Sequence, residues 1–264
     1  MANGEQKQFF EGLLIFLLLF IPLSVLLIFQ NNTPPQNNGD GNGSEDKDTS
    51  AHHWGVDSAS YTTEEFFACV KDNYGSPEVW GRYLGEKEGV SSGITKEEIK
   101  LFHDNDIKIL LIYNHFTDAT GKENGIDRAK HAIKLAEELN VPEGVAIFAD
   151  IEPDYPVDKD FMLGWMEEME KSKYVPGIYG VFSDEQAIYA AFNEAAEEDE
   201  KIKEKVLLWT AFPQEGVSKK ENAPNYQAFG PKDAKILGWQ YGLDGETCNI
   251  DTNLFKKEIL EYLW

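Results

Sequence analysis

The stretch GVAIFADIEPDYP, Gly144 to Pro156, joins an apolar run to two acidic residues at its end. Such a short, unbroken apolar run is typical of a buried β-strand. Side chains two positions apart on a strand point to the same side, so we expect Asp150 and Glu152 to lie next to each other. The stretch therefore predicts a strand that places two carboxyl groups at one end of a sheet.

Further β-rich runs alternate along the chain with amphipathic helical segments, a pattern that indicates βαβ units and a parallel sheet. The runs are HWGVDS, EVWGRYL, IKILLIYN, GVAIFADIE, VPGIYGVF, VLLWTAF, ILGWQYG and CNIDTN. Helices are expected over 62–73, 95–105, 125–140, 159–172 and 184–203, with Asp184 capping the last, and LFKKEILEYLW is expected to close the chain as a helix. No helix is expected between the last runs.

This order of elements favours an α/β fold in which a TIM-like barrel lacks helices between its last strands, with an open doubly wound sheet as the alternative. The 264 residues are enough for one such barrel. No GxGxxG motif follows a strand, which disfavours a dinucleotide site, and we expect no cofactor. No metal-ligand spacing such as HExxH occurs, so no metal site is expected either.

Composition narrows the possible partners. The 47 acidic residues outnumber the 24 basic ones, for a net charge of −23, which argues against binding to nucleic acid or anionic lipid. With 42% hydrophobic and 12% aromatic residues, the chain still has the composition of a folded protein rather than of an acidic disordered one.

One segment differs from the rest of the chain. Residues 12–29, GLLIFLLLFIPLSVLLIF, carry no charge and are long enough to cross the roughly 30 Å of a bilayer's hydrocarbon core. The alternative, a cleaved signal peptide, has a shorter apolar region and a small-residue cleavage site. We therefore expect a short cytoplasmic segment (1–11), a transmembrane anchor (12–29), a flexible linker (30–51) and a barrel domain (52–264).

The orientation of the anchor follows from its flanks. Lys7 precedes it, whereas no Lys or Arg follows it before Lys47, so the positive-inside rule favours a cytoplasmic N-terminus. The protein is then expected to cross the cell membrane once, with its C-terminal domain extracellular. In that compartment Cys69 and Cys248 can form a disulfide, and the alternative is two unrelated thiols.

Acids and aromatic residues occupy the ends of the β-rich runs, where barrel enzymes carry their chemistry. The acids are Asp57, Asp150, Glu152 and Asp251. Glycoside hydrolysis needs one carboxyl group as acid and another as base or nucleophile, beside aromatic rings that contact sugar faces. The expected substrate contacts are Tyr113, Tyr179, Trp209, Trp239, Gln240, Tyr241 and Arg82.

Several of these residues also have a structural interpretation. Asp251 can cap a terminal helix, and Asp57 can be a turn residue. Trp239 and Tyr241 lie two apart, hence on one face of a strand, where they can pack in the barrel core. Arg82 can pair with a neighbouring acid of the cleft instead of contacting an anionic substrate.

Six motifs in order resemble those of the glycoside hydrolase family 25 muramidases, the lysozymes of bacterial and phage origin. They are GVDSAS (55–60), DIE (150–152), GIYG (177–180), LWTA (208–211), WQY (239–241) and NIDTNLF (249–255). GRYLG (81–85) and residues 124–152 look closer still to a family of glycoside-hydrolase-like barrel domains of unknown function related to those enzymes. The resemblance extends from Trp54 to the end of the chain.

The resemblance implies a barrel with irregular final strands and assigns roles to the acids. Glu152 matches the proton donor of the muramidases, Asp150 matches its partner, and Asp57 and Asp251 match the other two acids of the cleft. The leading hypothesis is therefore a membrane-anchored extracellular hydrolase of peptidoglycan glycan, with a polysaccharide as its partner. The alternatives are a non-catalytic glycan-binding domain and a purely structural surface domain.

Overall fold

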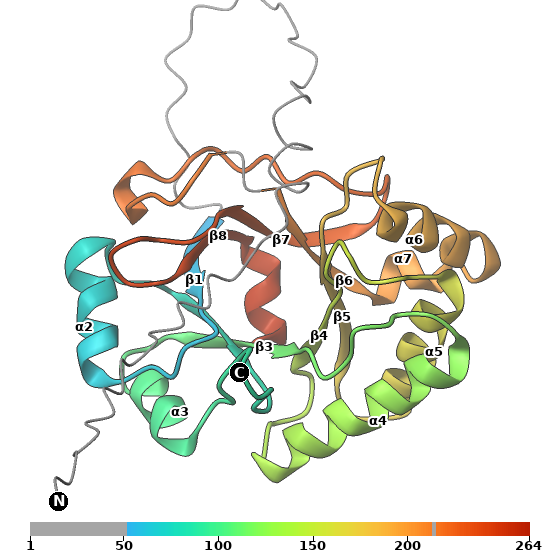
Figure 1. Ribbon diagram of the computed structural model, residues 1–264, viewed down its shortest axis with the longest axis horizontal. Helices are drawn as coiled ribbons and strands as arrows, with labels where there is room; N and C mark the ends of the chain where they lie inside the picture. The colour runs from blue at the N-terminus through green and yellow to red at the C-terminus, as the bar shows by residue number, and fades with distance from the viewer. Residues whose placement is uncertain (1–51, 213–214) are drawn as a thin grey trace, which may run out of the picture. The chain divides into compact units, whose positions relative to one another are not determined.

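The computed structural model describes residues 52–212 and 215–264, and within these ranges eight strands close into a barrel in chain order (Figure 1). The strands are β1 (His52–Asp57), β2 (Val79–Tyr83), β3 (Lys108–Tyr113), β4 (Ala146–Asp150), β5 (Val175–Gly180), β6 (Leu207–Ala211), β7 (Lys235–Gly242) and β8 (Asp251–Lys256). The closed barrel confirms the TIM-like fold expected from the sequence and excludes the open sheet.

Helices surround only part of the barrel. They are α2 (Glu64–Asn73), α3 (Lys96–His103), α4 (Lys122–Glu138), α5 (Lys159–Glu170), α6 (Ala187–Glu198) and α7 (Lys201–Lys205), with the short 3-10 helices η1 (Lys220–Asn222) and η2 (Lys257–Tyr262). Three expectations were wrong. The backbone at Asp199 is extended and breaks the long helix expected over 184–203, and Asp184 does not cap it, because α6 starts at Ala187 behind Gln186. The terminal helix is of the tighter 3-10 type.

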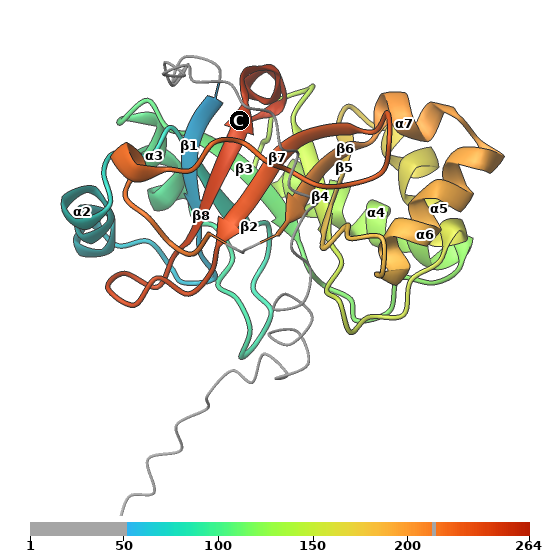
Figure 2. The same cartoon turned by 90° about the horizontal axis from the view of Figure 1, so that it is seen from above.

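The last strands depart from the parallel pattern. As expected, no helix of the described residues separates β7 from β8, and Figure 2 shows β8 lying between β7 and β1. The sequence did not predict that β8 runs antiparallel to both neighbours. Residues 243–250 are too short for the crossover of about a dozen residues that a parallel strand needs. The first residue of β8, Asp251, therefore lies at the end of the barrel where the other strands finish.

Two separate hydrophobic clusters hold the barrel together. One contains residues from the helices and is the layer between sheet and helices, whereas the other fills the barrel interior. Alternate strand residues supply the two, since successive side chains of a strand point to opposite faces. In β3, for example, Leu110 and Ile112 point inward, while Leu111 and Tyr113 point outward.

Helices α4 and α5 lie side by side (Figure 1), and glycines allow this close approach. A Cβ atom at Gly125 of α4 would stand 2.2 Å from the carbonyl oxygen of Phe161. A Cβ atom at Gly164 of α5 would stand equally close, at 2.2 Å, to the carbonyl oxygen of Lys122. Neither carbonyl oxygen can move away without distorting a helix, because both belong to helix backbones. The packing of this helix pair therefore requires both glycines.

A buried ion pair joins β2 to α3. Arg82 Nε donates to Glu98 Oε1 at 2.8 Å, and both side chains are fully buried. The guanidinium also donates to the carbonyl oxygens of Ser58 and Ser92, at 2.6 and 3.1 Å. Arg82 therefore points out of the barrel, and this placement corrects the expectation that it contacts substrate or a cleft acid. A buried guanidinium in which every nitrogen has a partner holds backbone segments together instead.

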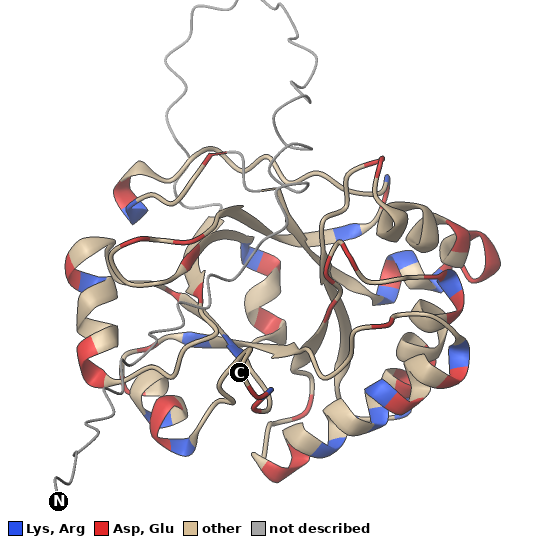
Figure 3. Cartoon of the chain, viewed as in Figure 1, with Lys and Arg blue, Asp and Glu red and all other residues tan. Residues whose placement is uncertain are grey.

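Many of the charged residues lie on the helices, and further acidic residues lie on the connecting loops (Figure 3). On α4 and α5, acidic and basic side chains are interspersed, and Lys122 bridges to Glu167 at 2.7 Å. The end of α6 and the turn after it are almost purely acidic, with the sequence EEDE at 197–200. Exposed ion pairs such as Lys122–Glu167 contribute at most about 1 kcal/mol each to stability. The charged surface residues therefore contribute little to the stability of the fold.

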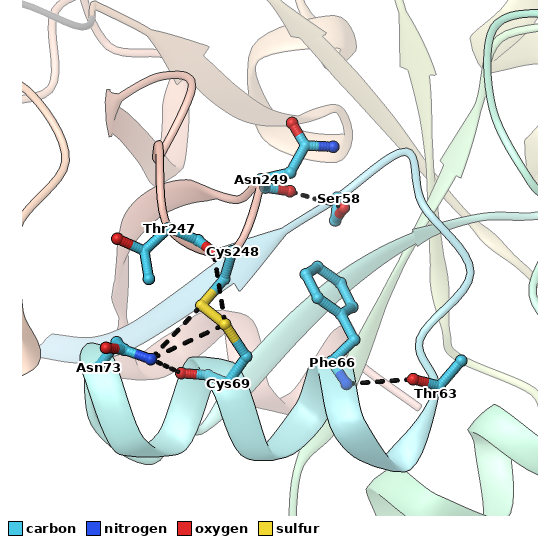
Figure 4. Close-up of a disulfide and its surroundings, with 8 residues drawn as sticks. All are labelled: Ser58, Thr63, Phe66, Cys69, Asn73, Thr247, Cys248 and Asn249. Carbon is cyan, nitrogen blue, oxygen red and sulfur yellow. Dashed lines mark hydrogen bonds between the residues drawn. A yellow bond between two sulfur atoms is a disulfide. The ribbon is translucent and has the colours of Figure 1, made fainter.

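Cys69 of α2 and Cys248 of the β7–β8 connection form a disulfide (Figure 4). It joins positions 179 residues apart. Asn73 Nδ2 donates to the carbonyl oxygen of Cys69 at 2.8 Å, and Ser58 Oγ donates to that of Asn249 at 3.0 Å. The segment that immediately precedes β8 is therefore held against α2 and the end of β1.

The expected anchor and linker, 12–29 and 30–51, lie outside the described residues. Within residues 52–212 and 215–264, no helix has the length and apolar character that crossing a bilayer requires.

We expect the double variant Cys69→Ser, Cys248→Ser to lose about 2–5 kcal/mol of the free energy of unfolding, since the bridge restricts the unfolded chain. Urea unfolding followed by tryptophan fluorescence measures this loss. Wild-type protein treated with a reducing agent serves as the control and should lose a similar amount. A loss below about 1 kcal/mol would show that the bridge adds little to stability.

Candidate functional site

Three strands bring the four predicted acids to one end of the barrel. Asp57 is the last residue of β1 and pairs in register with Asp251, the first residue of β8. Asp150 is the last residue of β4, and Glu152 follows two positions later. Tyr179 of β5 pairs in register with Asp150, and its hydroxyl contacts Gln240, whose amide contacts Asp57 and Asp251, so the two halves face each other. The four carboxyl groups form one set, which we call the carboxyl cluster.

A glycine makes room for Asp57 inside the barrel. Gly81 of β2 lies opposite Asp57 in the register, and a Cβ atom there would stand 2.6 Å from the Cβ atom of Asp57. Real side chains do not approach this closely. The alternation of β2 thus places Gly81 and Tyr83 inside and Arg82 outside.

Two amide side chains connect the acids of β1 and β8. Gln240 Nε2 donates to Asp57 Oδ1 at 3.1 Å and to Asp251 Oδ2 at 3.2 Å. Asn253 Nδ2 donates to Asp57 Oδ1 at 2.6 Å. Two neighbours fix the orientation of these amides: the Tyr179 hydroxyl donates to Gln240 Oε1 at 2.6 Å, and Trp209 Nε1 donates to Asn253 Oδ1 at 2.8 Å. The amide donors therefore point at the acids.

Burial dominates the electrostatics of Asp57 and Asp251. It raises the pKa of Asp57 to about 6, although hydrogen bonds from Asn253 and Gln240 and the charge of Arg82 act in the opposite direction. Burial, followed by the charge of Asp57, raises the pKa of Asp251 well above its usual range, against a hydrogen bond from the Asp244 amide. Both groups thus hold their protons more strongly than an exposed carboxyl group does.

Asp150 and Glu152 form the second pair of the cluster. Burial and then the charge of Glu152 raise the pKa of Asp150 well above its usual range. Burial and then the charge of Asp154 raise the pKa of Glu152, while a hydrogen bond with Asp150 lowers it. Asp150 is 4% exposed, and its Oδ1 has no hydrogen-bond partner among the described residues. Glu152 is more accessible than Asp150. The pair can hold a proton at the mouth of the barrel.

The structure adds residues that the sequence analysis did not assign to the site. Tyr83 lies on the same face of β2 as Gly81, and burial, then the charges of Asp150 and Asp57, raise its pKa well above the usual range. Asn253 contacts Asp57 directly. Tyr83 lies two positions after Gly81, and Asn253 lies two positions after Asp251. Residues two apart on a strand share a face, so strand alternation could have indicated both. Lys87, whose charge lowers the pKa of Asp150 and of Glu152, lies in the β2–α3 connection, where no strand alternation could have indicated it.

The predicted substrate contacts divide into two groups. Tyr179 and Gln240 lie at the cluster, and Trp209 lies beneath it at 1% exposure, with its ring centroid 4.4 Å from that of Tyr179. Trp239 and Tyr241 occupy the opposite face of β7 from Gln240 and are buried in the outer layer. The structure therefore corrects the expectation that these two residues contact a sugar.

Tyr113 also lies away from the cluster. It points outward from β3 into the helix layer, where its hydroxyl meets His131 Nδ1 at 2.9 Å and its ring stacks on Trp165 at 5.8 Å. Its side chain is fully buried. This is a correction of the sequence expectation, and the reason is the inward position of its neighbour Ile112. No group of acids, histidines or cysteines among the described residues is arranged to hold a metal ion.

Comparisons with known proteins agree with this architecture. Residues 76–234 match the model of the Rv2525c-like, glycoside hydrolase-like domain. An uncharacterized B. stearothermophilus protein is similar at 38% identity and a TM-score of 0.78, over 80% of this chain and 100% of that chain. No curated protein matches the chain.

Two more distant structures share the fold. One is the Mycobacterium tuberculosis Tat-secreted protein Rv2525c, crystallised with L-tartrate, at 14% identity and a TM-score of 0.52, over 78% of this chain and 96% of that one. The other is a muramidase from Acremonium alcalophilum, at 14% identity and a TM-score of 0.50, over 80% and 99%. The chain therefore belongs to the family of Rv2525c-like, glycoside hydrolase-like domains, as its sequence motifs predict.

Proposed function

We propose that this protein is a glycoside hydrolase that cleaves the glycan strands of cell-wall peptidoglycan. The carboxyl cluster carries this proposal: four acids meet at one end of a barrel, and each has a raised pKa. Glycoside hydrolysis needs a carboxyl group that keeps its proton near neutral pH beside one that can be ionised. The muramidase from Acremonium alcalophilum has the same fold, which supports peptidoglycan as the substrate class.

Glu152 is the proposed proton donor. It is more accessible than Asp150, so a glycosidic oxygen can approach its carboxyl group directly. Asp150 is the proposed partner, which carries the negative charge of the pair while Glu152 holds the proton, and which stabilises positive charge on the sugar. Asp57 and Asp251, held by Gln240, are proposed to add negative charge on the other side of the cluster. Tyr179 is the proposed ring for sugar contact, because it lines the same space.

Replacing Glu152 by Gln should reduce the release of soluble fragments from purified peptidoglycan by at least about 100-fold, because an amide cannot donate the proton. The full-length protein and its variant are compared by reducing-end and fragment release. The matched control is Glu143→Gln, which changes an exposed glutamate before β4, at the far end of that strand. It should leave the rate unchanged.

Two outcomes would contradict this assignment. A Glu152→Gln variant within about twofold of wild type would show that another group donates the proton. If neither protein released fragments but both bound the same glycan in a pull-down, the cluster would belong to a non-catalytic glycan-binding domain.

The cluster should also make stability depend on pH. The unfolded chain releases the Asp57 proton near its ordinary pKa of 3.8, whereas burial raises the pKa of Asp57 in the folded chain to about 6. Between these values the folded state binds more protons, so the free energy of unfolding should fall as pH rises, by about 3 kcal/mol for this group.

Urea unfolding at pH 4 to 7 tests this expectation in wild type and in Asp57→Asn, which cannot ionise. The fall should be smaller in the variant by about the stated amount. If the free energy of unfolding changed with pH in the same way in both proteins, the pKa of Asp57 would not be raised in the folded state.

We also propose that residues 12–29 anchor the protein in the cell membrane in a single pass, with 1–11 in the cytoplasm, 30–51 as linker and the barrel domain 52–264 outside. The uncharged apolar segment supports this arrangement. The full chain should sediment with membranes and resist extraction by alkaline carbonate, whereas a chain starting at Ala51 should not. If expression of the full chain instead yielded a soluble product that lacks the residues up to about position 29, the segment would be a cleaved signal peptide.

A further inference from the structure

The connection from β2 to α3 folds back on itself at the mouth of the barrel. The Lys87 amide donates to the Ser91 carbonyl at 2.9 Å, and the Ser91 amide donates to the Lys87 carbonyl at 3.0 Å. Gly89 lies between them with φ +72°, a left-handed conformation that closes the turn. The backbone of Lys87 is therefore fixed by a tight loop rather than free in solvent.

The ammonium group of Lys87 is fixed as well. Its Nζ donates to the carbonyl oxygens of Asn114 and Phe116, at 2.8 and 3.1 Å, just beyond the end of β3. Asn114 Nδ2 donates in turn to Ser91 Oγ at 3.0 Å, which adds a second contact between the two connections. Lys87 Nζ also lies 5.9 Å from the centroid of the Tyr155 ring.

This position brings a positive charge beside the Asp150–Glu152 pair. The Tyr155 amide donates to the Glu152 carbonyl at 3.0 Å, so the ring that Lys87 approaches belongs to the turn that starts at Glu152. The charge of Lys87 lowers the pKa of both Asp150 and Glu152, against the effect of burial. Both partners of its Nζ are neutral carbonyl oxygens, which leave its charge uncancelled.

Other charged and titratable groups face the same pair from the surrounding elements. They are Asp57 of β1, Tyr83 of β2, Asp154 and Tyr155 of the β4–α5 connection, Tyr179 of β5 and Asp251 of β8. All are acidic or neutral. Their combined effect favours two protonated carboxyl groups, a state in which neither member of the pair could act as an anion. A cation is needed to oppose them.

We propose that Lys87 is a positioning residue of the carboxyl cluster, whose fixed ammonium group keeps one member of the Asp150–Glu152 pair ionised. It acts through these carboxyl groups and need not touch the substrate. A mere link between loops would not require a charge, since a neutral donor can satisfy two carbonyl oxygens. The effect of Lys87 on catalysis rests on the proposed function, whereas its effect on the ionisation of Asp150 and Glu152 does not.

The test compares Lys87→Met and Lys87→Arg in the full-length protein. The matched control is Lys173→Met, because Lys173 also donates to a carbonyl oxygen, that of Val141 at 2.9 Å, and lies 5.2 Å from a tyrosine ring. Lys173 precedes β5, at the opposite end of the barrel from the cluster. Thermal unfolding first verifies that each variant is folded.

The first measurement is the pH profile of peptidoglycan cleavage. Both limbs should move to higher pH in Lys87→Met, because loss of the cation makes the pair harder to ionise. The profiles of Lys87→Arg and Lys173→Met should stay in place. If Lys87→Met only lowered the rate at every pH, Lys87 would be a loop link, and the proposal would be overturned.

The second measurement does not depend on turnover. Carbon-13 NMR of the carboxyl groups, with signals assigned through Asp150→Asn and Glu152→Gln, follows the titration of the pair directly. Lys87→Met should move both midpoints to higher pH. If wild type proved inactive but the midpoints moved, the proposed hydrolase would fail and the role of Lys87 would stand; unchanged midpoints would overturn that role whatever the activity.

Discussion

The need to keep four carboxyl groups together at the end of a closed barrel governs much of this structure. Each group loses hydration there and feels the charges of the others, so each pKa rises. The protein compensates with amide donors at Asp57 and with a lysine beside Asp150 and Glu152. These compensating groups in turn depend on Tyr179, Trp209 and the carbonyl oxygens after β3, which fix their orientation. The orientation of the polar groups at the site therefore depends on the aromatic side chains packed beneath them.

The direction of the last strand is the second determinant. In an all-parallel barrel Asp251, at the start of its strand, would lie at the far end from Asp57. The short β7–β8 connection reverses β8, and the same residue then pairs with Asp57 in register. The disulfide between Cys69 and Cys248 holds this connection three residues before Asp251. Loop length, a covalent bond and the position of an acid are therefore linked in one segment.

Much of this could be predicted from the sequence. The apolar run before Asp150 predicted a strand that ends in two neighbouring acids, Asp150 and Glu152. The spacing of the β-rich runs indicated a barrel that lacks helices between its last strands. Strand direction could not be predicted, because an apolar pattern is the same in parallel and antiparallel strands. Arg82 was misplaced for a different reason: a strand-end position says nothing about the face, and its partner Glu98 lies on a helix. The role of Lys87 depends on a loop conformation that no periodic pattern encodes.

The space that Gly81 leaves opposite Asp57 limits what can be concluded from the acidic residues of a related sequence. Gly81 belongs to β2, a strand that supplies none of the four acids, yet its missing side chain is what admits Asp57 to the interior. An aspartate at the position of Asp57 is therefore not sufficient evidence of an intact cluster. A relative that keeps every acid but carries even alanine at the position of Gly81 must rearrange β1 or turn that aspartate away. The acidic motif and the glycine have to be inherited together.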